Sequence, residues 1–338
     1  MTSQETGRAE RPTRFILQWH ITHRCNLSCV HCYQKDTACN ASPADFTEIL
    51  DKYERFLKAG NYYGYVYLTG GEPLVHPAFF TLLEELRRRQ LLFCVLSNGT
   101  LIDSRAANRI AWYGAEFVQV SLDGTREIHD RIRGKGAFDR ALRGIDELTA
   151  LEVPVLVSFT AQKGNTECFP ELAKICSEHR VRKLWWDRVV TDTPEGTEKL
   201  ALSTAEFQAF VKQSRRLNRK YRRRDGSSLV SCERSLQFIG NRRADFCYTC
   251  HAGQDMITIL ADGSLMPCRR LPFTIGNIHD GELEALLSSD PLMEKLKHPP
   301  VPEGCLACAH ADTCRGGAKC VTYGQTGSLF GKDVNCFL

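Results

Sequence analysis

The feature of this sequence that most constrains its fold is a regular alternation of two kinds of segment between residues 14 and 190. Short segments rich in β-branched and aromatic residues alternate with longer segments whose apolar residues recur at helical spacing. This alternation predicts a parallel α/β sheet with right-handed crossovers. Six such units are too few to close the usual eight-stranded barrel, so we expect an open, partial (β/α)6 barrel. The strand-like segments are 14–22, 65–73, 91–100, 116–124, 154–165 and 181–190.

Polar loops follow the first four predicted strands, at 24–32, 69–73, 97–100 and 121–124. In parallel α/β folds, ligands collect at the carboxyl ends of the strands. We therefore expect the functional site at that end of the sheet, built from these four loops.

The alternation stops near residue 190. We predict one helix over 204–224, with seven basic residues in its last ten positions, and a strand pair over 256–268 that turns at Asp262 and Gly263. These changes of pattern divide the chain into a disordered tail (1–13), the barrel (14–190), a basic linker helix (191–230) and a small cysteine-rich domain (231–338).

Cysteine is the compositional anomaly. The chain of 338 residues has 16 cysteines, of which three lie at 25–32 and nine between Cys232 and Cys336. We see no secretory signal and no run of about 18 apolar residues, so we predict a cytoplasmic protein that does not enter the membrane. Because the cytosol keeps thiols reduced, clustered cysteines there indicate metal rather than disulfides. The formal charge of +4 is too small to indicate a nucleic-acid partner.

Cys25, Cys29 and Cys32 lie in the loop after the first predicted strand. Three thiolates can hold three irons of a [4Fe–4S] cluster and leave the fourth iron open to a small molecule. With this spacing, and with Gly-Gly-Glu-Pro after the second strand, the sequence resembles the radical S-adenosylmethionine (SAM) superfamily. The resemblance implies a catalytic cluster that cleaves SAM to a 5′-deoxyadenosyl radical, which abstracts hydrogen from a C–H bond. A partial zinc site is the alternative for these thiols.

The same resemblance implies which residues bind SAM. The glycine turn after the second strand would bind its amino group, and the loops after the third and fourth strands would bind its ribose or carboxylate. Arg133 is a candidate partner for the carboxylate, because a guanidinium pairs with it bidentately. His31 stands where the family usually has an aromatic residue. The predicted cofactor-binding residues are His31, Gly70, Gly71, Glu72, Pro73, Asn98, Ser121, Asp123 and Arg133.

The cysteines after residue 230 resemble the SPASM extension of radical SAM enzymes, which holds auxiliary [4Fe–4S] clusters. Cys250 and Cys268 match the part of the pattern that belongs to the cluster nearer the barrel. A complete farther cluster is implied by four further matches, at Cys305, Cys308, Cys314 and Cys336. A zinc ribbon is the alternative, because paired cysteines with short spacers also bind zinc.

One departure from the SPASM pattern affects the nearer cluster. Ala318 stands where the family has its next cysteine, so Cys247 and Cys320 are the candidates to replace that ligand. We therefore expect one or two auxiliary clusters. Cys232 fits no position of the pattern, and we interpret it either as a buried structural thiol or as a hydrogen-atom donor at the mouth of the barrel.

Together the resemblances imply an oxidoreductase that modifies a peptide, such as a ribosomally made precursor, by crosslinking, epimerisation or a related oxidation. The first alternative is a small-molecule radical SAM enzyme of the porphyrin-precursor decarboxylase or alcohol dehydrogenase type. The second is a non-enzymatic zinc or iron–sulfur binding module.

The expected partners follow from this interpretation. Because the first strand begins near residue 14, we expect no leader-binding domain ahead of the barrel, which implies a separate leader-binding protein, direct recognition, or no leader. A flavodoxin- or ferredoxin-type protein would supply electrons. The basic run 215–224 suits an acidic leader or an acidic reductant, although a solvated helix end is the simpler interpretation.

Overall fold

The computed structural model describes residues 12–34, 39–191, 193–232 and 250–338. One sheet contains all its named strands, in the order β6-β5-β4-β3-β2-β1-β7-β8-β9. Strands β1 to β6 pair in parallel in chain order, which confirms the open, partial (β/α)6 barrel. The strands are β1 Thr13–His20, β2 Tyr62–Thr69, β3 Leu92–Ser97, β4 Val118–Ser121, β5 Val155–Ala161, β6 Lys183–Arg188, β7 Met256–Ile259, β8 Ser264–Met266 and β9 Gly276–Asn277.

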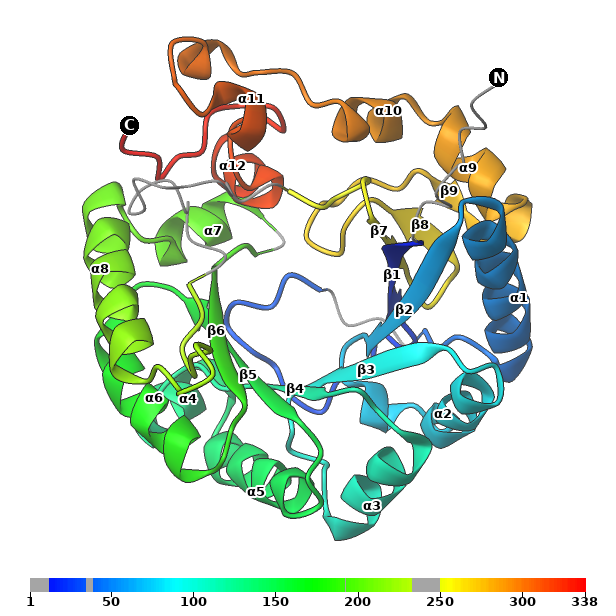
Figure 1. The fold of residues 1–338 in the computed structure, drawn as a ribbon, viewed down its shortest axis with the longest axis horizontal. Coiled ribbons are helices and arrows are strands. Elements are labelled where there is room, and N and C mark those ends of the chain that lie inside the picture. Colours follow the sequence, from blue (N-terminus) through cyan, green and yellow to red (C-terminus); the bar gives the residue numbers. More distant parts are fainter. Residues whose placement is uncertain (1–11, 35–38, 192, 233–249) are drawn as a thin grey trace, which may run out of the picture.

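Most helices of the barrel lie outside the curved sheet, whereas the C-terminal helices lie across its remaining side (Figure 1). The barrel helices are α1 Pro43–Ala59, α2 Phe79–Arg88, α3 Ser104–Tyr113, α4 Arg126–Arg133, α5 Ala137–Ala150, α6 Phe169–Glu178, α7 Pro194–Leu200 and α8 Thr204–Lys220. The C-terminal ones are α9 Leu283–Ser289, α10 Pro291–Lys297, α11 Ala311–Cys314 and α12 Lys319–Thr326. Short 3-10 turns are η1 Pro73–Val75, η2 Thr166–Cys168, η4 Ile278–Asp280 and η5 Glu303–Cys305.

Local sequence explains where several helices begin and end. Ser42 caps α1 in a capping box with Asp45, because each side chain accepts a hydrogen bond from the other's backbone N–H. A second capping box, between Ser203 and Glu206, starts α8. The prediction of one helix over 204–224 is wrong at its end, because α8 stops at Lys220. The polar helix α4 has only two buried residues, and its weak apolar pattern left it unpredicted.

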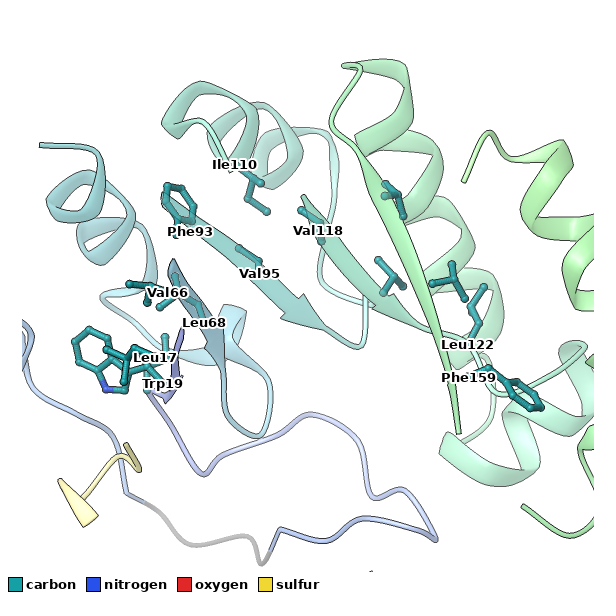
Figure 2. Close-up of a cluster of buried hydrophobic side chains, with 14 of the residues drawn as sticks. Leu17, Trp19, Val66, Leu68, Phe93, Val95, Ile110, Val118, Leu122 and Phe159 are labelled. Carbon is teal, nitrogen blue, oxygen red and sulfur yellow. The ribbon is translucent and has the colours of Figure 1, made fainter. Parts of the chain in front are cut away.

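The hydrophobic core lies between the strands and the helices that cover them. Figure 2 shows Leu17 and Trp19 of β1 beside Val66 and Leu68 of β2, and Ile110 of α3 near Val118 of β4. Each of these side chains is fully buried. Burial of such a side chain stabilises the fold by about 1.5–3 kcal/mol. The sheet therefore holds the strand ends, and the loops that follow them, in fixed positions.

The C-terminal region joins the barrel through β1. Strand β7 pairs in parallel with β1, so that Ile16 lies opposite Met256 and Trp19 opposite Ile259. Strand β8 then pairs with β7 in antiparallel fashion, as the predicted turn at Asp262 and Gly263 requires. The cysteine-rich region thus continues the barrel's sheet, and the expected boundary at residue 231 does not separate two sheets. Among the described residues, no helix combines the length and apolar composition needed to cross a bilayer.

The basic run lies at the amino ends of the strands, away from the cysteine loop. Arg215, Arg222 and Arg223 line a cavity there together with Lys183, the first residue of β6. Cys232 lines the same cavity, with its Sγ 3.1 Å from the Ser214 Oγ. The hypothesis that Cys232 is a hydrogen-atom donor at the barrel mouth is therefore wrong in this structure.

Candidate active site

The loop after β1 brings its three predicted cluster ligands to one cavity. Cys25, Cys29 and Cys32 line a cavity of about 410 Å³ at the carboxyl ends of the parallel strands. All three thiols are free. The Cys32 backbone N–H donates to the Cys29 carbonyl over 3.1 Å, which forms the turn between the second and third thiols. Gly70, Gly71, Asn98, Ser121, His31 and Arg133 line the same cavity, so most of the predicted SAM-binding set is brought together.

The two glycines after β2 allow the cysteine loop to pass close to the strand. The Gly71 N–H donates to the Thr22 carbonyl, and the Glu72 N–H to the Arg24 carbonyl, each over 2.9 Å. A Cβ at Gly70 would collide with the Thr22 carbonyl oxygen, and one at Gly71 with that of Arg24. The glycine turn therefore holds the backbone that leads directly into Cys25, in addition to lining the cavity.

Glu72 braces two loops from behind the cavity wall. Its buried carboxylate accepts hydrogen bonds from the Ser97 Oγ (2.8 Å) and the Asn98 backbone N–H (2.7 Å). Burial raises the pKa of Glu72 to about 7, although these hydrogen bonds oppose the rise. Neither Glu72 nor Pro73, which begins η1, is among the described residues that line the cavity. The structure thus gives Glu72 a positioning role and does not bring these two side chains to a ligand.

Asn98 and Ser121 lie at the ends of β3 and β4, facing the cavity. The Asn98 Nδ2 donates to the Asn26 Oδ1 over 2.8 Å and lies 3.9 Å from the Cys25 Sγ. Asn98 therefore ties the loop after β3 to the cysteine loop. The Ser121 Oγ lies 3.5 Å from the Oγ of Ser158 on β5. Both serines line the cavity.

Arg133 connects the fourth strand's loop to the cysteine loop. Its Nε donates to the Asp123 Oδ2 over 2.5 Å, and its NH1 lies 3.7 Å from the Cys29 Sγ. Burial alone would raise the pKa of Asp123, but the Arg133 guanidinium holds it below the ordinary value. Asp123 is fully buried and does not line the cavity, whereas Arg133 does. Asp123 thus positions Arg133, which can still present donors to a ligand.

His31 is buried at the same corner of the site. Its Nε2 lies 3.5 Å from the Asp123 Oδ2, while its Nδ1 has no hydrogen-bond partner among the described residues. Burial lowers the pKa of His31 to about 4, so its imidazole is neutral at pH 7. A neutral ring with one unused nitrogen on the cavity wall suits a polar group of a bound cofactor.

The spacing of the thiols separates an iron–sulfur cluster from a single zinc ion. Thiolates around one zinc, with bonds of about 2.3 Å, lie about 3.8 Å from one another. In the described part of the chain, no three cysteine sulfurs lie within 4.8 Å of one another. Three free thiols that open onto one cavity fit three irons of a [4Fe–4S] cluster instead. The geometry therefore disfavours the zinc alternatives for the described cysteines.

The nearer auxiliary group gathers Cys250, Cys268 and Cys320. All three line one cavity of about 80 Å³ beside the barrel. Burial raises the pKa of each of these thiols, and each is raised further by another member of the group. Cys320 thus lies with Cys250 and Cys268 in this chain, in which Ala318 stands at the position of a SPASM cysteine. Cys247, the other candidate ligand, lies outside the described residues.

The farther auxiliary group contains the four cysteines that match the complete cluster. Burial raises the pKa of Cys305, and nearby Cys314, Cys336 and Cys308 raise it further. Cys308 precedes α11, Cys314 is the last residue of that helix, and Cys336 comes from the C-terminal segment. Four free thiols from three segments therefore converge, as a fully ligated cluster requires.

Sequence reasoning missed the arginines of the cavity wall other than Arg133. Arg188, Arg269 and Arg270 all line the cavity. Arg269 and Arg270 directly follow Cys268 in the sequence. Their position next to a motif cysteine was the signal that could have placed them at the site. Arg188 ends β6, at the same edge of the sheet as the cysteine loop.

The fold and these cysteine groups define the class of this protein as an iron–sulfur enzyme with a cofactor cavity at the strand ends. Residues 19–176 match the model of the Radical SAM superfamily, and residues 250–309 match SPASM, an iron–sulfur cluster-binding domain. The chain therefore belongs to the radical SAM superfamily and carries a SPASM domain. Its cofactors are [4Fe–4S] clusters and SAM.

Known relatives span nearly the whole chain. The mycofactocin maturase MftC of Mycobacterium tuberculosis is 29% identical over 337 residues, which cover 95% of this chain and 82% of that protein. The pre-heme d1 synthase of Dinoroseobacter shibae is 25% identical over 368 residues, covering 96% of this chain and 86% of that protein. SuiB of Streptococcus suis, solved with its precursor peptide SuiA, has the same fold, with a TM-score of 0.76 at 18% identity, over 96% of this chain and 76% of that one.

Proposed function

We propose that this enzyme modifies a peptide, and that Cys25, Cys29 and Cys32 ligate its catalytic cluster. The observation that carries the proposal is the convergence of three free thiols from one loop on the cavity at the strand ends. Similarity to a maturase, and a shared fold with a protein solved with its precursor peptide, support a peptide as substrate.

The residues of the cavity would perform distinct tasks. When bound, the cluster and SAM supply a 5′-deoxyadenosyl radical that abstracts hydrogen from the substrate. Asn98 and Ser121 would hold the polar groups of SAM, Arg133 its carboxylate, and the unused nitrogen of His31 a further polar group. Gly70 and Gly71 keep the cysteine loop against β2, so that the three thiols stay in register with these side chains.

The cysteine groups of the SPASM domain would hold two auxiliary clusters. We assign Cys305, Cys308, Cys314 and Cys336 to the farther cluster, and Cys250, Cys268 and Cys320 to the nearer one. Cys247 remains the sequence candidate for a fourth ligand there. A cytoplasmic location, a flavodoxin- or ferredoxin-type reductant and a separate leader-binding protein also remain predictions from the sequence. We assign no docking role to the basic run, which lies at the opposite end of the barrel from the thiols.

The experiment uses the anaerobically reconstituted enzyme with SAM and dithionite. Short peptides encoded beside the gene are added one at a time, and products are analysed by mass spectrometry. We expect 5′-deoxyadenosine and a mass change in at least one peptide. SAM cleavage without a change in any peptide would contradict the proposal. A haem precursor is the matched small-molecule substrate class, because the relatives include a pre-heme d1 synthase and an AdoMet-dependent heme synthase. Conversion of a haem precursor alone would establish the small-molecule alternative.

A further inference from the structure

Four arginines line the catalytic cavity, and three of them already have carboxylate partners. Arg133 pairs with Asp123 (2.5 Å), Arg270 with Asp187 (2.5 Å), and Arg188 with Asp333 (2.6 Å). These pairs are at most 18% exposed on either side chain. The charge of each of these three guanidinium groups is therefore balanced by a carboxylate of the protein, although Arg133 still presents donors to the cavity.

Arg269 is different from its neighbour Arg270. Within the described part of the chain, Arg269 takes part in no ion pair and no side-chain hydrogen bond. Asp187 is the one carboxylate among the described residues that line the cavity, and it is bound to Arg270. A guanidinium has five N–H donors in a planar fork that matches a carboxylate. An unpaired one on a cavity wall is thus suited to bind an anion that comes from outside the chain.

The position of Arg269 places such an anion between the catalytic and auxiliary cysteines. Arg269 lines the main cavity with Cys25, Cys29 and Cys32, and it also lines the smaller cavity with Cys250, Cys268 and Cys320. It lines a third cavity, of about 300 Å³, with the buried His20 at the end of β1. Its charge is felt inside the barrel, because it opposes the rise in pKa that burial causes at Cys94 of β3.

We propose that Arg269 binds a carboxylate of the substrate and so fixes which peptide residue faces the radical. The inference rests on the proposed function and narrows its substrate to peptides with a carboxylate at or beside the modified residue. The carboxylate can come from the peptide's C-terminus or from an aspartate or glutamate side chain. Both present the same planar group to the guanidinium.

Two other roles for Arg269 predict different results. Arg269 could instead balance the negative charge of the adjacent Cys268 thiolate and so stabilise the nearer auxiliary cluster. Loss of Arg269 would then lower the iron content. If it bound the carboxylate of SAM, its loss would weaken SAM binding. A substrate role alters neither quantity.

The test measures binding of N-terminally labelled peptides, encoded beside the gene, to the reconstituted enzyme with SAM by fluorescence anisotropy. Each peptide is used unmodified, with a C-terminal amide, and with its acidic residues changed to their amides. The variants are Arg269→Gln, Arg269→Lys and, as the matched control on the exposed face of α5, Arg143→Gln. Iron content and SAM affinity are measured for each.

We expect Arg269→Gln to weaken binding of the unmodified peptide about 10- to 100-fold, which is the range for loss of a hydrogen-bonded charge pair. The peptide form that lacks the recognised carboxylate should bind the wild type and Arg269→Gln with equal affinity. Which form behaves in this way shows whether the carboxylate comes from the C-terminus or from an acidic side chain. Arg269→Lys should bind at an intermediate level, and Arg143→Gln as wild type. Equal weakening of all peptide forms, or loss of iron or SAM affinity, would overturn the inference. Wild-type enzyme that binds no peptide would instead contradict the proposed function, and this inference with it.

Discussion

The Arg133 Nε lies 2.5 Å from the fully buried Asp123 Oδ2, and the same guanidinium reaches within 3.7 Å of the Cys29 Sγ. This ion pair joins the loop after β4 to the cysteine loop. Asp123 also accepts a hydrogen bond from the Thr160 N–H of β5 over 2.8 Å. Two loops and strand β5, which are distant in sequence, are therefore held together by one buried charge pair.

Replacement of that carboxylate tests the connection. Asp123→Asn leaves the Arg133 guanidinium buried without its counter-charge, which should lower the free energy of unfolding by about 3 kcal/mol. The matched control is Asp139→Asn, because Asp139 pairs with Arg126 at the surface and should contribute less than about 1 kcal/mol. Chemical denaturation of both variants measures the difference. Equal stability losses would show that the buried pair has no special role.

The glycine turn should tolerate no side chain. Gly71→Ala places a Cβ against the Arg24 carbonyl oxygen, so the cysteine loop must shift. We expect a loss of about 2 kcal/mol in stability, together with reduced SAM cleavage. Gly281→Ala is the control, because a Cβ there meets only ordinary contacts at 3.8 Å from Leu286. Wild-type cleavage by Gly71→Ala would contradict the close approach of the two backbones.

Glu72 should make stability depend on pH. Its folded pKa, about 7, is above the ordinary value of 4.5, so protonation favours the folded state. The corresponding stability is complete below pH 4.5 and is lost as pH rises through about 7. Between pH 6 and pH 8 the free energy of unfolding of the wild type should fall by about 1 kcal/mol, whereas that of Glu72→Gln should not show this fall.

Thermal unfolding at the two pH values measures this difference. The matched control is Glu84→Gln on the exposed face of α2, which should follow the wild type. A pH dependence in Glu72→Gln identical to that of the wild type would assign the effect to other groups.

The auxiliary groups predict separable iron losses. With three four-iron clusters the wild type should hold about twelve irons per chain. Cys320→Ala should lose about four of them if Cys320 ligates the nearer cluster. Cys176→Ala should lose none, because Cys176 is a buried core thiol of α6. Iron and sulfide analysis gives the counts. Twelve irons in Cys320→Ala would remove this residue from the ligand set.

Much of the fold was predictable because it depends on local pattern. The alternation of strand-like and helix-like segments gave the parallel sheet, and the loops after the strands gave the location of the cavity. Strand β7 was predicted as half of a hairpin, but its pairing with β1 was not predicted. The local sequence of a strand does not show which distant strand it pairs with. The end of α8 was misplaced, since basic residues continue past Lys220 without the helix.

The site was predictable to the extent that its residues belong to motifs. The three thiols, the two glycines, Asn98, Ser121 and Arg133 all line one cavity, as expected from the loops. Glu72 and Asp123 are also present, but they act from behind the wall, and no sequence pattern distinguishes a side chain that supports a site from one that lines it. Arg269 was not predicted, because its proposed role depends on the lack of an ion-pair partner among the described residues. The sequence alone does not show which charged side chains form ion pairs.

The central claim is that Cys25, Cys29 and Cys32 hold the cluster that cleaves SAM. The most direct test is 5′-deoxyadenosine formation by the reconstituted variant in which all three are alanine, with iron counted in the same sample. We predict no 5′-deoxyadenosine and a loss of about four irons, while the iron of the auxiliary groups remains. SAM cleavage at the wild-type rate by this variant would contradict the account.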